Sequence, residues 1–148
     1  MDYDEDTVDF GEYISAYKRK KNKSKNTIAV INLEGEIDTR ESREAVINYD
    51  NVIEKLEALE DIKNLKGLVL RINSPGGSAL ESEKIYQKLK KLEIPIYISM
   101  GDLCASGGYY IATVGKKLFA NSVTLTGSIG VVVLYPEFTE AINKLKVN

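Results

Sequence analysis

Two short glycine-rich stretches contain the residue types that could do chemistry. The first is NSPGGS at residues 73–78, where Gly76 and Gly77 permit backbone conformations that other residues resist. The second is ASGG at residues 105–108, which places Ser106 between small neighbours. A serine hydroxyl presented on a tight turn can act as a nucleophile, and backbone N–H groups beside it can bind the negative charge on an attacked carbonyl. The pattern therefore predicts acyl-transfer chemistry centred on Ser106.

Each of these turns is expected to follow a strand and to open a helix. The apolar runs KGLVLRIN (66–73) and IPIYISM (94–100) are typical of buried strands in a parallel sheet. Ligands of open parallel sheets bind at the carboxyl ends of the strands, where both turns must lie. We therefore expect the N–H of Gly107 and the amides of the first turn to converge near the Ser106 hydroxyl, as an oxyanion hole.

The rest of the chain continues the alternation of strand and helix. The segment 27–37 predicts a strand ending at Gly35, and 38–48 is polar and resembles a loop. Further predicted elements are a helix from Tyr49 with Val52, Ile53, Leu56 and Leu59 on one face, a helix with the stripe Leu80, Ile85, Leu89 and Leu92 that Pro95 ends, a helix over 104–115, short strands in 116–121 and 127–135, and a final helix over 136–147. This order favours an α/β fold with mainly parallel strands.

Composition fits a single soluble globular domain. The chain has 148 residues, of which 43% are hydrophobic and 28% charged, and its net charge is −2. This balance predicts no bulk attraction to nucleic acid, and no apolar run is long enough to span a bilayer. Residues 1–26 are acidic and then basic, which is typical of a solvated tail or linker, with a nucleic-acid patch as the alternative. The globular domain is expected to occupy 27–148.

The sequence contains no histidine. This excludes a Ser-His-Asp or Cys-His site within the chain and most zinc sites. We expect neither a metal nor a cofactor. A base would have to be Lys, Asp, Glu, Tyr or a backbone group. A lysine base must be desolvated to stay neutral, and the lysines here lie in exposed patterns. The single cysteine, Cys104, is expected to be a small buried hydrophobic residue.

The run from Leu68 to Val133 resembles the signal peptide peptidase A family, also called protease IV. Three segments carry the resemblance, which extends over the body from Thr27 onward: NSPGGS, ASGGYY and TLTGSIG. A more distant similarity is to the proteolytic subunit of Clp and to crotonases. The resemblance implies a crotonase/Clp-protease-like fold of repeated β-β-α units with mainly parallel strands.

The resemblance also implies a serine peptidase with a Ser-Lys dyad that cleaves the apolar cores of signal peptides at the membrane. Ser106 matches the nucleophile, and Gly107 and Gly77 match the oxyanion donors. By the same resemblance, Gly76 is a supporting residue near the site. Thr126 and Ser128 are weaker supporting candidates, which would make polar contacts with the lysine.

In the family the dyad lysine lies outside the segment that corresponds to this chain. Long members are tandem duplications with the lysine in the first half, and residues 9–37 resemble the junction into the second half. The chain is therefore interpreted as the nucleophile-bearing C-terminal half of a long form, incomplete at its C-terminus and inactive alone. The resemblance implies a homo-oligomeric, membrane-associated protein with an extracytoplasmic site that binds extended apolar peptides; this fragment is expected to be soluble, without an anchor.

Two alternatives stay open. A crotonase-type acyl-CoA enzyme would use the same pair of turns to hold a thioester, but it needs an acid or base on the helix after the second turn. Residues 108–116 offer only tyrosines there before Lys116. A non-catalytic assembly or binding module of the same fold is the other alternative, and the intact ASGGYY segment argues against it.

Overall fold

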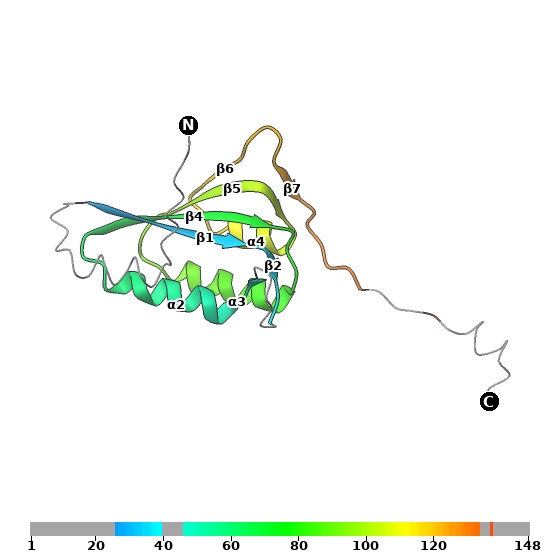
Figure 1. The fold of residues 1–148 in the computed structure, drawn as a ribbon, viewed down its shortest axis with the longest axis horizontal. Coiled ribbons are helices and arrows are strands. Elements are labelled where there is room, and N and C mark those ends of the chain that lie inside the picture. The colour runs from blue at the N-terminus through cyan, green and yellow to red at the C-terminus, as the bar shows by residue number, and fades with distance from the viewer. Residues whose placement is uncertain (1–25, 40–45, 134–136, 138–148) are drawn as a thin grey trace, which may run out of the picture.

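A parallel sheet with helices on one face forms the body of the protein (Figure 1). The computed structural model describes residues 26–39, 46–133 and 137. Four strands follow the order β1 (Thr27–Glu34), β4 (Leu65–Ser74), β5 (Ile96–Ala105) and β6 (Lys117–Phe119), and β7 (Leu125–Gly127) also pairs with β5. All of these pairs are parallel. The predicted parallel α/β fold is confirmed.

The helices α2 (Tyr49–Glu60) and α3 (Ala79–Lys90) lie side by side against one face of the sheet (Figure 1). In α2 the predicted face is confirmed, because Val52, Leu56 and Leu59 are buried. Their partners in the core are alternate residues of the central strands, among them Leu70 and Ile98. The side chains of β1 also alternate between buried and exposed positions along the strand.

The predicted apolar stripe of α3 is only half right. Ile85 and Leu89 are buried, but Leu80 is 63% exposed. At 100° per residue Leu80 lies about 140° around the helix from Ile85, and the inward positions of the first turn belong instead to Glu81 and Ser82. Leu92 follows the end of the helix at Lys90 and is partly buried. The helix therefore ends several residues before Pro95.

A two-stranded parallel sheet lies within the segment predicted as strand end and loop. Its strands are β2 (Glu36–Ile37) and β3 (Val46–Ile47). The sequence did not reveal β3 because two residues are too few for an alternating pattern. Ile37 and Ile47 are both buried, and Ile37 also bridges to Gly77 in the first glycine turn. The small sheet thus connects the end of β1 to the candidate site.

The last described segment is extended without being a strand. β7 ends at Gly127, and residues 128–133 have no regular secondary structure, so the strand predicted over 127–135 is wrong for them. A strand needs a hydrogen-bonded neighbour, and this segment runs away from the sheet (Figure 1). The predicted final helix over 136–147 and the charged tail lie outside the described residues, except for Asn26 and Glu137. No helix within the described ranges is both long and apolar enough to cross a membrane.

Candidate active site

A break in the pairing of β4 and β5 positions the end of both strands. Ile72 pairs with Met100 and Ser74 with Cys104, so three residues of β5 oppose the single residue Asn73. The amide oxygen of Asn73 accepts a hydrogen bond from the Leu103 N–H at 3.1 Å and so occupies the bulge. Such bulges bend a strand and redirect the residues that follow it. Here the residues that follow lead to Ser106.

The first glycine turn is fixed to β2 by its own backbone. The Ile37 N–H donates to the Gly76 carbonyl at 2.8 Å, and the Ser78 N–H donates to the Ile37 carbonyl at 2.7 Å. Gly76 and Gly77 have φ angles of 94° and 144°, and a Cβ on Gly77 would lie 2.1 Å from the Ile37 oxygen. In a trans peptide the C=O and N–H point in opposite directions. Because the Gly76 carbonyl points at β2, the Gly77 N–H points away from it.

Buried Ser74 supports the same turn from inside. Its hydroxyl oxygen accepts a hydrogen bond from the Gly76 N–H at 3.1 Å, and the side chain is fully buried. Its Cβ would also lie 3.2 Å from a side chain added to Gly108. The serine therefore satisfies an amide of the first turn while filling the space against the second.

Ser106 lies at the N-terminus of α4 (Gly107–Ala112) in a backbone conformation that is rare for a residue with a side chain. Its φ is 51° and its ψ is −122°, and its hydroxyl makes no capping hydrogen bond to the helix. The backbone is held by the Ser106 N–H, which donates to Gly127 at 2.9 Å, and by the Tyr110 N–H, which donates to Ser106 at 2.8 Å. Strain of this kind costs about 1–3 kcal/mol and often marks functional residues. A serine on a strained strand-to-helix turn is also how α/β-hydrolases present their nucleophile.

The two glycine turns touch each other. A Cβ built on Gly76 would lie 2.7 Å from the Ser106 Cβ and 2.7 Å from the Gly107 nitrogen. The first amides of a helix have no acceptor within that helix, so the Gly107 N–H is available beside the serine. Ser106 is partly exposed, as a nucleophile must be. The structure thus brings together Ser106, Gly107 and the Gly76–Gly77 bend, while their catalytic roles stay predictions.

A groove of about 950 Å³ runs past Ser106. Gly77 and Gly107 line it beside the serine, and the extended segment 128–132 lines it on another side. Ile129, Val131 and Val132 of that segment are each at least 79% exposed, which gives the groove an apolar wall. No lysine is among the described residues that line the groove.

The two weaker candidates from the TLTGSIG segment have different positions. The Thr126 hydroxyl donates to the Cys104 carbonyl at 2.7 Å, and Thr126 does not line the groove. Its hydroxyl is thus engaged in the pairing of β7 with β5. Ser128 does line the groove and, like Ser106, has a φ of 51°. Of the two, only Ser128 is placed to contact a ligand there.

Cys104 is the buried residue that the sequence predicted, with no exposed surface. Burial raises the pKa of its thiol to about 11, so the thiol is protonated at neutral pH. Such a thiol is a poor nucleophile. Within the described part of the chain no group of three or more His, Cys, Asp or Glu side chains could hold a metal ion.

Sequence reasoning missed the carboxylate of Glu83, which lines the groove from α3. The Tyr110 hydroxyl from α4 donates a hydrogen bond to this carboxylate, and the Tyr110 ring lies 4.9 Å from that of Tyr86 between centroids. The hydrogen bond from Tyr110, followed by that from Gln87, lowers the pKa of Glu83. Tyr110 is 27 residues away in sequence, so no local pattern could have shown the pair.

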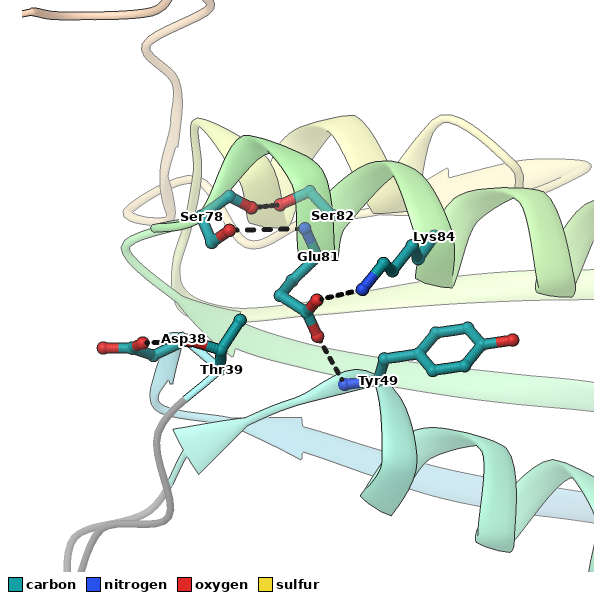
Figure 2. A network of polar contacts seen from close by, with 7 residues as sticks. All are labelled: Asp38, Thr39, Tyr49, Ser78, Glu81, Ser82 and Lys84. Atoms are coloured by element: carbon teal, nitrogen blue, oxygen red, sulfur yellow. Dashed lines mark hydrogen bonds and ion pairs between the residues drawn. The ribbon is translucent and has the colours of Figure 1, made fainter.

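A second carboxylate, Glu81, holds the two helices together behind the first turn (Figure 2). It is 3% exposed, accepts a hydrogen bond from the Tyr49 N–H at 3.0 Å and pairs with the Lys84 ammonium at 2.9 Å. Its own N–H donates to the Ser78 hydroxyl at 3.3 Å, and the Ser82 hydroxyl donates to the Ser78 carbonyl at 2.7 Å. The start of α3, and with it the glycine turn, is thereby anchored to the start of α2.

The fold and the paired glycine turns define a class of protein: an α/β protein with a parallel sheet that presents a serine on one helix-opening turn beside a second, glycine-rich one. A solved structure of a mutant of the 1510-N membrane-bound stomatin-specific protease has the same fold, with a TM-score of 0.63 and 21% identity over 82% of this chain and 60% of that one. This likeness agrees with the parallel sheet described above and concerns the fold alone.

The sequence identifies the family. The model of peptidase family S49 matches residues 88–148. Protease 4 of Haemophilus influenzae is 42% identical over 126 residues, covering 83% of this chain and 20% of the relative. A protein named putative signal peptide peptidase SppA of Enterococcus faecium is 42% identical over 103 residues, covering 68% and 30% respectively. The chain belongs to peptidase family S49, and it spans a fifth to a third of the length of these relatives.

Proposed function

We propose that this chain carries the nucleophile and the oxyanion hole of a serine endopeptidase. One observation supports this most strongly: the glycine bend of the first turn meets Ser106 and Gly107, with 2.7 Å from the Cβ position of Gly76 to each. A pure scaffold has no chemical need for a serine hydroxyl at that point. The strained backbone of Ser106 and its uncapped hydroxyl also favour a catalytic role.

In this proposal the Ser106 Oγ attacks the carbonyl carbon of the scissile peptide bond and gives its proton to a base. The N–H groups of Gly107 and Gly77 donate to the oxygen as it becomes negatively charged, and one such donor is typically worth about 3–4 kcal/mol. Collapse of the tetrahedral intermediate breaks the C–N bond, and the base returns the proton to the leaving amine. Water then hydrolyses the acyl-enzyme by the same steps in reverse.

The base is a lysine from outside the described residues and, by the resemblance to the tandem form, from another part of the full-length protein. Lys84 is the lysine nearest the first turn in sequence, and its ion pair with Glu81 raises its pKa. An amine with a raised pKa stays charged and cannot accept the serine's proton. Separated from its lysine, the chain is expected to be a very poor peptidase.

The proposed substrate is an extended apolar peptide, such as the core of a cleaved signal peptide, and the full-length protein is proposed to act at the membrane as a homo-oligomer. The apolar wall formed by Ile129, Val131 and Val132 supports an apolar substrate. An extended peptide could pair its backbone with this segment while alternate side chains enter the groove.

The decisive experiment is labelling of the full-length protein with a serine-directed phosphonate. We expect covalent labelling that maps to Ser106 and disappears in Ser106→Ala. Ser122→Ala, which removes an exposed hydroxyl from the loop before β7, serves as the matched control and should label normally. Equal labelling of the wild type and Ser106→Ala would remove the peptidase interpretation.

A further inference from the structure

The groove beside Ser106 contains one charged side chain, and the proposed reaction does not use it. Among the described residues that line the groove, Glu83 alone carries an ionisable acid or basic amine; the others are small, aliphatic, hydroxyl-bearing or aromatic. A substrate that covered this carboxylate without supplying a partner would bind less tightly, because removing a charge from water is unfavourable. The groove therefore favours a ligand that brings a cation to Glu83.

Two hydrogen bonds fix the orientation of this carboxylate. The Tyr110 hydroxyl donates to one oxygen, and the Gln87 side-chain N–H donates to the other at 2.9 Å. The Tyr110 ring is itself held against Tyr86, with 4.9 Å between centroids and 34° between planes. An ionised carboxylate has about four acceptor positions, so two hydrogen bonds leave room for further donors. Glu83 is thus held in place and still able to bind a third group.

Glu83 is ionised at neutral pH, and none of the described residues supplies a cation to it. The hydrogen bonds from Tyr110 and Gln87 lower its pKa, and the charge of Lys90 adds to this. The Lys90 ammonium lies over the Tyr86 ring, 5.8 Å from its centroid, and no ion pair to Glu83 occurs within the described part of the chain. Lys84 is engaged with Glu81 on a different side of the helix. Over residues 26–39, 46–133 and 137, no direct ion pair neutralises the negative charge of Glu83.

The Glu83 carboxylate lies in the same groove as the proposed nucleophile. Glu83 and Ser106 both line this groove, and Tyr110, which donates to Glu83, belongs to the helix that begins directly after Ser106. In an extended peptide, side chains two residues apart point to the same side. A peptide that lies in the groove and is cleaved at Ser106 would therefore present a side chain close to the cleaved bond to Glu83.

We propose that Glu83, oriented by Tyr110, is a specificity subsite for a cationic side chain, Lys or Arg, two residues from the cleaved bond of the peptide. This inference rests on the proposed peptidase function and deepens it. The preferred substrate is then an apolar peptide with one basic residue close to the cleavage site, rather than a uniformly apolar one.

The test uses the full-length protein and quenched fluorogenic peptides that differ in one residue. Lys or norleucine is placed two residues before or two residues after the cleaved bond, so that chain length and apolar stem are matched. The wild type should cleave one of the Lys peptides with a kcat/KM about tenfold above its norleucine twin at low salt, as expected for a partly exposed charge-assisted contact. Glu83→Gln should reduce this ratio to near one.

Charge reversal and a matched control sharpen the test. Glu83→Lys should prefer a Glu peptide over the Lys peptide, because the sign of the subsite is inverted. Glu57→Gln removes the same charge from an exposed position on α2, outside the groove, and should keep the Lys preference. The affinities of the Lys and norleucine peptides for Ser106→Ala measure the same preference without turnover.

The outcomes separate this inference from the function on which it rests. Ser106-dependent cleavage of all peptides with equal kcat/KM, or a Lys preference that survives Glu83→Gln, would overturn the subsite and leave the peptidase standing. If no peptide is cleaved in a Ser106-dependent way and the phosphonate does not label Ser106, the proposed function fails and the subsite with it.

Discussion

Replacing Gly76 by alanine is expected to damage the site in a way that the structure allows one to calculate. The added Cβ would lie 2.7 Å from the Ser106 Cβ, whereas ordinary contacts begin at 3.4 Å, so the two turns must separate by about 0.7 Å (3.4 − 2.7). The φ of 94° adds a backbone cost of about 1–2 kcal/mol, and overpacking typically adds about 1–3 kcal/mol. We expect a total loss of about 2–5 kcal/mol in the free energy of unfolding.

Activity should suffer more than stability does. The separation falls between the Ser106 hydroxyl and the amides of the first turn, and a misplacement of about 1 Å can reduce a rate by about 100-fold. The assay is the rate of phosphonate labelling of the full-length protein, measured at a temperature where urea titration shows the variant to be folded. We expect a loss of one to two orders of magnitude in that rate.

Gly127→Ala is the matched control for the stability effect. Gly127 also has a positive φ, of 90°, but a Cβ there would meet nothing within 4 Å. It should therefore show the backbone cost of about 1–2 kcal/mol without the overpacking cost. A folded Gly76→Ala protein that labels at the wild-type rate would refute the claim that contact between the two turns positions the nucleophile.

Two further predictions concern Asn73 and Cys104. Asn73→Ala removes the acceptor of the Leu103 N–H in the bulge, and urea unfolding should show a loss of about 1–3 kcal/mol; an unchanged midpoint would mean that the bulge does not depend on this side chain. Native Cys104 should resist iodoacetamide at pH 8 and react fully in urea, because burial raises the pKa of the folded thiol to about 11. The stability that this thiol contributes is fully present below pH 9.0, the pKa of an unperturbed thiol. Between pH 9.0 and about pH 11 the free energy of unfolding should therefore fall by about 1.4 kcal/mol per pH unit, and Cys104→Ala should lack this dependence.

The sequence predicted those parts of the molecule that depend on local pattern. Continuous apolar runs indicated β4 and β5, and the spacing of Val52, Leu56 and Leu59 indicated the buried face of α2. The convergence of the two glycine turns was predictable because the carboxyl ends of parallel strands share one edge of the sheet. Contact between Gly76 and Ser106 agrees with that reasoning.

Features that depend on contacts between distant segments were not predictable. Glu81 took an inward position that the pattern assigned to Leu80, because its carboxylate satisfies the Tyr49 N–H at the start of another helix. The pair of Glu83 and Tyr110 joins two helices that the sequence separates by a strand. The strand β3 exists only because Ile37 and its neighbour provide a pairing edge for Val46 and Ile47.

The two backbone hydrogen bonds between β2 and the first glycine turn have a consequence for inhibition. With the Gly76 carbonyl anchored to Ile37, the peptide bond that carries the Gly77 N–H cannot rotate without breaking a bond of 2.8 Å, so this amide keeps its direction in the empty protein. Electrophiles such as peptide boronates, which form a tetrahedral anion on the serine, would meet a preassembled cradle. Their affinity should depend on that cradle and far less on the lysine that turnover requires.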